Sequence, residues 1–428
     1  MTRSALIAAA LVTLIPALAQ THGGDPLARE ALRTDDAGGW ALVTNFGIMR
    51  SDDLTHYVCE EAFLGGDDFR VVALGPTRWI TFSRAAIMKT DDGCSFRQIA
   101  PLTRAPAAAA AAGERVIYAS NADGARGLFL SGDGGEQFAQ LTIAGAEAVI
   151  WTGLGALADG AFVASGYDSA PGATRGDARL WRIQGAAATP LTLPSGAKYP
   201  YLMAARGAHV AGVMGLGELQ AAFWIGADGA IAQHTLERWP GGMALDAQGQ
   251  TLHIAGATQA GGLWRGVWSG GAPAWEIVAA AHPARCVTQP GDTPLLCASR
   301  MTQDHDLSAL SADGGWEARV RFQDLLGPQR GCPAGSQVRQ VCPAVWDELA
   351  VALRVPADRE PPEVEPPAPD MGAGGSDQGM EQVEDEAPLR GSAACSAGPG
   401  GQASGAGALG LVGALWGIRR RSRRGPRR

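Results

Sequence analysis

A turn-like octapeptide recurs about every forty residues, and this recurrence constrains the fold more than any other feature of the chain. Ser131–Phe138 reads Ser-x-Asp-x-Gly-x-x-aromatic, and Lys89–Phe96 and Arg50–Tyr57 are weaker copies of it. Each copy contributes one aspartate, and the steps between them are 39 and 42 residues: Asp52, Asp91 and Asp133. A turn that returns at this period is typical of one small β-unit repeated many times along a chain.

Later stretches keep the spacing although they lose the motif. Short β-like runs bounded by Gly, Asp and Pro continue, with turn centres near 184, 227, 270 and 313. An extra loop, Tyr167–Asp177, accounts for the one longer step. Seven centres predict an all-β chain folded as a β-propeller of seven four-stranded antiparallel blades. Six or eight blades, or a pair of β-sandwiches, remain as alternatives.

The repeat also predicts how the chain is divided. We expect the propeller to span 20–355 and the chain after it to carry an acidic linker, 356–392, and a C-terminal segment, 393–428. The proline and apolar spacing of Pro343–Val355 predict a short helix packed on the ring. The expected blades are 39–60, 61–101, 102–142, 143–194, 195–238, 239–280 and 281–325, followed by a closing segment, 326–355.

The residues of the motif suit a tight turn between two outer strands. Ser131 and Asp133 are predicted to hydrogen-bond to nearby backbone amides, and Gly135 to adopt a positive φ. Phe138 is expected to fold back over the turn and bury. The second copy is predicted to use the same positions, with Lys89 in place of the serine: Asp91, Gly93 and Phe96.

These motifs resemble the Asp-box, or bacterial neuraminidase repeat, of sialidase-like β-propellers. The resemblance implies a structural role on the rim for the box residues, remote from any active site. Sialidases also carry a Phe/Tyr-Arg-Ile-Pro motif, and the nearest string here, Trp181–Gln184, lacks the proline. We therefore assign no catalytic, cofactor or metal residues. A calcium site at Asp91 and Asp92 would need ligands from elsewhere in the chain.

Two functional hypotheses follow from this reading. The first is a non-catalytic binding, adhesion or assembly module whose ligand is a protein or a glycan. The alternative is a sialidase-like or other glycoside hydrolase that uses the central pocket. A carboxylate pair for glycosidic cleavage cannot be chosen from the sequence alone.

Six of the seven cysteines lie in the predicted propeller, and an even set in an exported chain predicts disulfides. Cys286 and Cys297 fall opposite each other if Gly291-Asp292 forms a two-residue turn. Sequence proximity favours the other two pairs, Cys332 with Cys342 and Cys59 with Cys94. Zinc is the rival interpretation, but there is no Cys-x-x-Cys pair.

Both ends of the chain predict export. Residues 1–19 have the charge, apolar run and Ala-x-Ala site of a signal peptide, with cleavage between Ala19 and Gln20. Residues 356–392 are rich in acid and proline and predict an extended linker. The formal net charge of −8 gives no electrostatic basis for binding nucleic acid.

The C-terminal segment combines Cys395, a glycine-rich spacer, a short apolar run over 403–418 and seven terminal arginines. This arrangement resembles the MYXO-CTERM sorting signal of myxobacteria. The resemblance implies cleavage near Cys395 by a processing machinery and attachment at the cell surface or outer membrane. A simple C-terminal transmembrane anchor is the alternative, with the arginines on the cytoplasmic side.

Overall fold

The computed structural model describes residues 26–357 except 36, 67, 170–175, 217–218, 237–239, 257–261, 269–272, 281–283, 299–305 and 311–314. The chain divides into two units, Met1–Glu363 and Val364–Arg428, and every described residue belongs to the first. The predicted signal cleavage site at Ala19 and Gln20, and Cys395 in the predicted sorting segment, lie outside the described residues.

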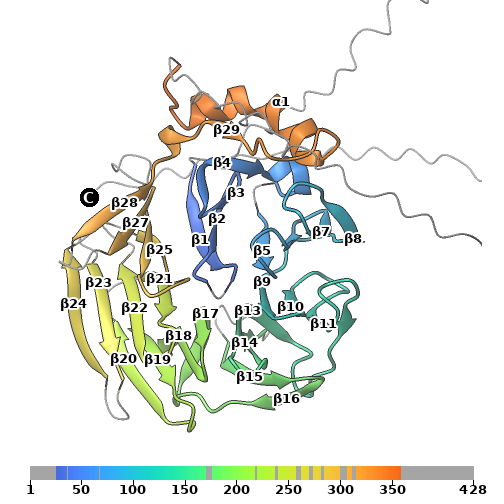
Figure 1. Cartoon of the computed structure of the whole chain (residues 1–428). Helices are drawn as coiled ribbons and strands as arrows, with labels where there is room; N and C mark the ends of the chain where they lie inside the picture. The colour runs from blue at the N-terminus through green and yellow to red at the C-terminus, as the bar shows by residue number, and fades with distance from the viewer. Residues whose placement is uncertain are drawn as a thin grey trace, which may run out of the picture. The chain divides into compact units, whose positions relative to one another are not determined.

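Seven antiparallel sheets follow one another around a central axis (Figure 1). The prediction of a seven-blade β-propeller with four antiparallel strands per blade is therefore confirmed. Each blade is built from four consecutive strands, of which the first lies nearest the axis and the last lies at the outside.

The strands of blades 1 to 4 are β1 (Ala28–Arg33), β2 (Trp40–Thr44), β3 (Gly47–Arg50), β4 (Asp53–Cys59), β5 (Arg70–Ala73), β6 (Trp79–Phe82), β7 (Ala86–Thr90), β8 (Arg97–Pro101), β9 (Ala108–Ala112), β10 (Arg115–Ser120), β11 (Gly127–Ser131), β12 (Ala139–Gln140), β13 (Val149–Ala156), β14 (Phe162–Asp168), β15 (Ala178–Gln184) and β16 (Ala187–Pro190). Those of blades 5 to 7 are β17 (Ala197–Arg206), β18 (His209–Leu216), β19 (Leu219–Ile225), β20 (Ile231–Leu236), β21 (Pro240–Leu245), β22 (Thr251–Gly256), β23 (Gly262–Val267), β24 (Ala274–Ala280), β25 (Ala284–Thr288), β26 (Leu295–Ala298), β27 (Leu307–Leu310) and β28 (Trp316–Val320).

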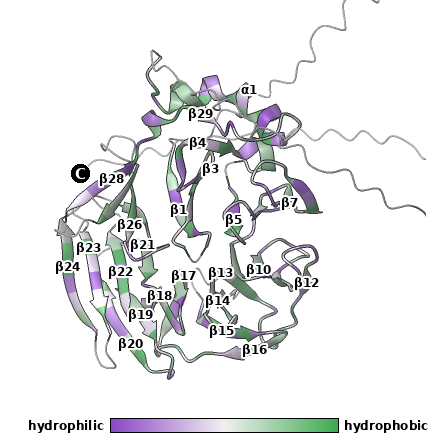
Figure 2. Cartoon of the chain, viewed as in Figure 1, coloured by the Kyte–Doolittle hydropathy of each residue, from purple (hydrophilic) through white to green (hydrophobic). Residues whose placement is uncertain are grey.

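The core lies between the blades, because each sheet has two faces to cover and no layer of its own to cover them. One apolar cluster joins Ile80 and Phe82 of blade 2 to Val116 and Tyr118 of blade 3. A second cluster joins blade 3 to blade 4 in the same way. This two-sided burial explains why the middle strands read as nearly continuous apolar runs (Figure 2). A blade is thus stable only between its neighbours.

The closing segment, 326–355, lies on the outside of blades 1 and 2. Two 3₁₀ turns lie nearby: η1 (Glu60–Phe63) follows β4, and η2 (Phe322–Asp324) follows β28. The short strand β29 (Gly327–Pro328) comes after η2 and pairs in parallel with β4. The helix α1 (Gln337–Ala352) follows and contacts β29, β4 and η1. No helix among the described residues is long and apolar enough to span a bilayer.

Two boundaries differ from the sequence prediction. The first blade begins at Ala28, before the expected position 39, because β1 supplies its inner strand. The helix begins at Gln337, six residues before Pro343, because the Ser336 hydroxyl accepts from the Arg339 N–H and caps it. Pro343 therefore lies inside α1 and does not start it.

The structure corrects two of the three predicted disulfides. Cys286 and Cys297 are joined as expected, because they face each other across the β25–β26 hairpin. Cys332 and Cys342 are not joined to each other, and neither are Cys59 and Cys94. The bonds are Cys59–Cys342 and Cys94–Cys332, with Cα–Cα distances of 5.5 and 5.4 Å. The reason is that the closing segment crosses both blades, so each of its cysteines meets a different blade.

Candidate functional site

The best copy of the octapeptide forms a turn held by two side chains. The Ser131 hydroxyl donates to Asp133 Oδ1 at 2.6 Å and accepts from the Gly135 N–H at 2.8 Å. Asp133 Oδ1 also accepts the N–H groups of the two residues after Gly135. These hydrogen bonds hold the pKa of Asp133 below its usual value, and the bond from Ser131 has the largest effect. Phe138 packs against the ring of Tyr118, with centroids 5.1 Å apart.

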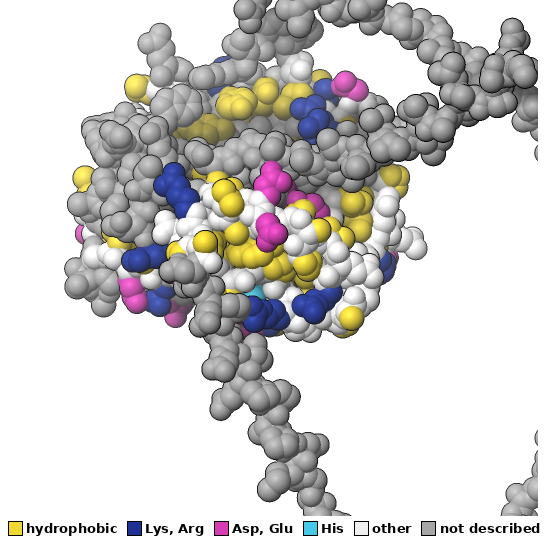
Figure 3. Space-filling view, turned by 90° about the horizontal axis from the view of Figure 1, so that it is seen from above, with side chains coloured by type: hydrophobic (Ala, Val, Ile, Leu, Met, Phe, Trp, Pro, Cys, Tyr) yellow, Lys and Arg dark blue, Asp and Glu magenta, His cyan; other side chains and the backbone are white. Residues whose placement is uncertain are grey.

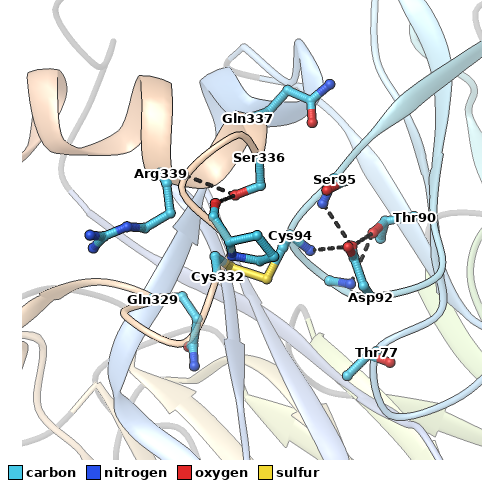
Figure 4. The surroundings of a disulfide bond; sticks show 12 residues. Thr77, Thr90, Asp92, Cys94, Ser95, Gln329, Cys332, Ser336, Gln337 and Arg339 are labelled. Carbon is cyan, nitrogen blue, oxygen red and sulfur yellow. Dashed lines mark hydrogen bonds between the residues drawn. A yellow bond between two sulfur atoms is a disulfide. The ribbon is translucent and has the colours of Figure 1, made fainter.

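In the second copy the turn is shifted by one residue, which corrects the predicted role of Asp91. Thr90 supplies the hydroxyl, and Asp92 Oδ1 accepts the N–H groups of Cys94 and Ser95 at 2.8 and 2.7 Å (Figure 4). Burial opposes ionisation of Asp92, but these N–H donors outweigh it and lower its pKa. Asp91 is 62% exposed and lies 3.6 Å from the Arg78 guanidinium.

The glycine and the aromatic residue of the second copy lie as the motif suggests. Gly93 has a φ of +72°, and its N–H donates to the Thr90 hydroxyl. Phe96 is buried in the core shared by blades 1 and 2, and its backbone N–H and carbonyl both bond to the Gln337 side chain. This turn of blade 2 is therefore also a contact point for α1.

The first copy is a tight hairpin, and Asp52 does not stabilise it through backbone N–H groups. Arg50 pairs with Asp53 across a two-residue turn, and exposed Asp52 bonds to the Arg50 side chain. Asp53 takes the capping role by accepting from Thr55, and it also bonds to His56 Nδ1 at 3.0 Å. The three motifs thus mark outer hairpins of the propeller and form no common site.

The innermost strands carry a different set of ionisable residues, which the sequence analysis did not select. These strands surround the central axis, where propellers have their channel (Figure 1). Along β9 all five residues are alanine, and β13 and β21 carry no charged residue. The seven innermost strands contain one acidic residue, Glu30, and six basic ones: Arg29, Arg33, Arg70, Lys198, Arg206 and Arg285.

One end of the axis is marked by Glu30 between two arginines. Arg29 lies over the ring of Phe69, with its Cζ atom 5.3 Å from the centroid, and Arg70 begins β5 on the next blade. Burial raises the pKa of the Glu30 carboxyl, while the charges of Arg70 and Arg29 oppose that rise. Arg70 is also paired with Asp68 at 2.8 Å. The group can therefore hold a proton or contact an anion.

The other end is marked by Arg206, the last residue of β17. Its guanidinium donates to the backbone carbonyls of Gln289 and Pro290 in blade 7, at 3.0 and 3.4 Å. Among the described carboxylates none forms an ion pair with Arg206. Burial lowers the pKa of Arg206, and the like charge of Arg33 adds to the effect. Arg206 thus links blade 5 to blade 7.

Buried polar residues fix the turn that Arg206 contacts. His253 Nδ1 donates to Gln289 Oε1 at 3.1 Å, and Gln289 Nε2 donates to the Asp292 carbonyl. His253 is 4% exposed, and burial lowers its pKa to about 4. The ring is therefore neutral near pH 7. The sequence does contain a signal for this end of the axis, because single arginines stand at the ends of the Ala-containing strands β1 and β17.

A shallow groove of about 400 Å³ lies where the turn of blade 2 meets α1. The buried Lys89 ammonium bonds to Glu136 of blade 3 at 2.5 Å, and Arg97 bonds to the same carboxylate. Two cations thus share one carboxylate here, and Asp91 and Asp92 also line the groove, so charges of both signs lie close together. The face that carries α1 presents hydrophobic side chains beside acidic and basic ones (Figure 3).

Within the described ranges no group of three or more His, Cys, Asp or Glu residues is placed to hold a metal ion. The fold and the two axial ends define a seven-bladed β-propeller with a mainly basic inner ring. Neither a known protein family nor a curated protein matches the sequence.

Solved structures of similar fold include the GH74 xyloglucanase of Xanthomonas campestris, with 16% identity over 67% of this chain and 52% of that one, and a TM-score of 0.49. The GH74 enzyme of Niastella koreensis has 13% identity over 65% of this chain and 53% of that one, with a TM-score of 0.46. The propeller domain of the trilobed protease from Pyrococcus furiosus has 8% identity over 69% of this chain and 98% of that one, with a TM-score of 0.49. The chain spans about half the length of the two GH74 proteins.

Proposed function

We propose that this protein is a non-catalytic binding propeller of the cell surface, acting in adhesion or assembly, and that its ligand contacts the inner ring. The observation that carries the proposal is the composition of the innermost strands. They hold one carboxylate, Glu30, whereas cleavage of a glycosidic bond usually needs two facing carboxyl groups. The five alanines of β9 leave room for a ligand, and neither β9 nor β13 supplies a charged acid–base group.

The basic residues of the inner ring favour an acidic protein segment or an acidic glycan. A ring of one charge inside low-dielectric walls concentrates the field along its axis. Arg206 contributes most clearly, because its described partners are backbone carbonyls and its charge is not neutralised by an ion pair. The chain as a whole is acidic, with a formal net charge of −8. An anionic ligand would therefore be drawn to the axis and not to the outer surface.

The test is a binding screen of the purified chain on an array of neutral, sialylated and sulfated glycans and acidic peptides. We expect an acidic ligand whose affinity falls about tenfold in Arg206→Gln, consistent with the loss of one charged contact. Arg319→Gln is the matched control, because Arg319 pairs with Glu317 on an outer strand. Binding that both variants leave unchanged would contradict a ligand at the axis.

A glycoside hydrolase remains the second candidate because of Glu30. A half-buried carboxyl whose pKa is raised by desolvation, against the charges of Arg70 and Arg29, has the properties of a general acid. The same glycan panel should be followed for released reducing sugar. Turnover by the wild-type chain that is lost in Glu30→Gln would overturn the non-catalytic proposal.

The chain's ends support a proposal about its address. Residues 1–19 match a signal peptide, and Cys395 with the apolar run and arginines after it matches a sorting or anchoring signal. The turns at Ser131 and Thr90 likewise support membership of the Asp-box propellers. Cell fractionation tests the anchor: Cys395→Ser is expected to move the protein from the envelope to the medium. A protein that stays in the envelope without Cys395 would favour a simple transmembrane anchor.

A further inference from the structure

The ring has one seam, between blades 7 and 1, where the first and last blades of the chain meet. The four main strands of each blade are consecutive in the chain, and among the described strands β29 alone comes from the far end of the propeller to join another blade, at the outer edge of blade 1. Six pairs of neighbouring blades are joined by the loop that runs from one to the next. Blade 7 is joined to blade 1 by the closing segment, which runs to the outer edge of blade 1. The inner strands of the two blades are adjacent, and Thr288 Oγ1 donates to the Ala31 carbonyl at 2.6 Å.

The closing segment supplies covalent links near this seam. It leaves blade 7 after β28 and joins blade 1, where β29 pairs with β4 and Phe322 packs on Phe46 with ring centroids 5.0 Å apart. It then reaches blade 2, where Cys332 bonds to Cys94. The helix α1 brings it back to blade 1, where Cys342 bonds to Cys59.

Directed contacts align the closing segment with blade 2 around the second disulfide. The Gln337 amide exchanges two hydrogen bonds with the backbone of Phe96, at 2.9 and 2.7 Å, as a neighbouring strand would. The Val338 N–H donates to the Cys94 carbonyl at 3.3 Å. Figure 4 shows Ser336 and Gln337 beside the Cys94–Cys332 bond and the Asp92 turn. The turn hydrogen bonds of Asp92 thus hold Cys94 in place for its partner.

We propose that the closing segment is a latch that holds the propeller shut at the seam between blades 7 and 1. The two long-range disulfides fasten this segment to blades 1 and 2, where its strand pairing covers only the two residues of β29, so removing them loosens the seam selectively. Blades 4 and 5 lie away from the seam and keep their own chain connections, so their strands stay protected. This inference concerns ring closure and does not depend on which ligand the propeller binds.

Amide hydrogen exchange followed by mass spectrometry tests the latch, because it reports opening region by region. The variant is Cys59→Ser/Cys342→Ser combined with Cys94→Ser/Cys332→Ser. We expect exchange in β1–β4 and β25–β28 to accelerate about tenfold or more, and exchange in β13–β20 to change less than about threefold. The control, Cys286→Ser/Cys297→Ser, removes a disulfide within one hairpin and should accelerate exchange mainly in β25 and β26.

Two outcomes would overturn the latch. One is equal acceleration in all blades, which would mean that the disulfides stabilise the domain without acting on the seam. The other is an unchanged seam. If the fourfold variant does not fold, Cys94→Ser/Cys332→Ser alone retains the Cys59–Cys342 bond and allows the same regional comparison. Acceleration there is expected first in β5–β8 and α1, and a uniform rise again contradicts the proposal.

Discussion

Cys59 and Cys342 are bonded to each other although 283 positions separate them in the sequence. Cys59 ends the outer strand of blade 1, and Cys342 lies in α1 with both side chains fully buried. The bond encloses nearly the whole propeller in one covalent loop. In the chain-entropy model a loop of this size stabilises the folded state by about 5 kcal/mol. The ends of the ring are thus joined by this disulfide in addition to the short β29–β4 pairing.

The shifted turn of blade 2 gives a matched pair of substitutions. Asp92→Ala removes the acceptor for Cys94 and Ser95 and should lower the free energy of unfolding by about 1–3 kcal/mol. Asp91→Ala removes an exposed charge 3.6 Å from Arg78 and should cost less than about 1 kcal/mol. Urea unfolding of the oxidised proteins measures both. A larger loss for Asp91→Ala would contradict the shifted register.

The turn of blade 3 requires glycine at its fifth position. Gly135 has a φ of +83°, and an added Cβ would lie 2.1 Å from Ile80 Cδ1 in the neighbouring blade. Gly185 also has a positive φ, of +60°, but an added Cβ there meets open space. Both alanine variants should lose about 1 kcal/mol from backbone strain, and Gly135→Ala about 1–2 kcal/mol more from the clash. Equal losses in thermal unfolding would argue against close packing at Ile80.

Because Asp306 is buried, we expect the folded protein to lose stability as the pH rises from about 4 to about 6. Burial raises its pKa from 3.8 to about 6, so the folded state binds more protons than the unfolded chain in this window. Asp306→Asn keeps an acceptor for the Phe322 N–H and removes the ionisation. The variant should be more stable than wild type by about 1–2 kcal/mol at pH 7. If the difference in stability between Asp306→Asn and wild type is the same at pH 4 and at pH 7, Asp306 does not have this role.

We expect His253 to give the opposite dependence of folding stability on pH. Its pKa is lowered from 6.5 to about 4, so the folded state binds fewer protons and stability falls as the pH drops through this window. His253→Gln should lose about 1 kcal/mol at pH 7, because the bond to Gln289 is altered. It should also flatten the decline below pH 6.5, measured as the urea midpoint from pH 4 to pH 8. A variant that keeps the wild-type slope would exclude His253 as its source.

The sequence predicted those features that local spacing determines. A forty-residue period is the length of one blade, so the motif turns and the four evenly spaced turn centres after them predicted the ring. Cys286 and Cys297 are close in the sequence and share one hairpin, so their pairing followed from the turn between them. Adjacent residues of one type are a different matter. Asp91 and Asp92 are both acceptable in a turn, and only the position of the Thr90 hydroxyl selects Asp92.

Features that depend on contacts between distant segments were not predictable. The pairing of Cys332 with Cys94 depends on the path of the closing segment over blade 2, which no local pattern records. The contact between Arg206 and the Gln289 carbonyl depends on the spatial order of blades 5 and 7. The motifs drew attention to the outer hairpins, whereas the ionisable residues near the axis lie on short Ala-rich strands without a motif.

Peptide mapping of the non-reduced protein tests the central claim most directly, because the closure of the ring rests on which cysteines are joined. Free thiols are blocked, the chain is digested, and cross-linked peptides are identified by mass spectrometry before and after reduction. We expect links between Cys59 and Cys342 and between Cys94 and Cys332, in addition to the local link between Cys286 and Cys297. A peptide in which Cys332 is joined to Cys342 would contradict this claim, because the closing segment would then be tied only to itself.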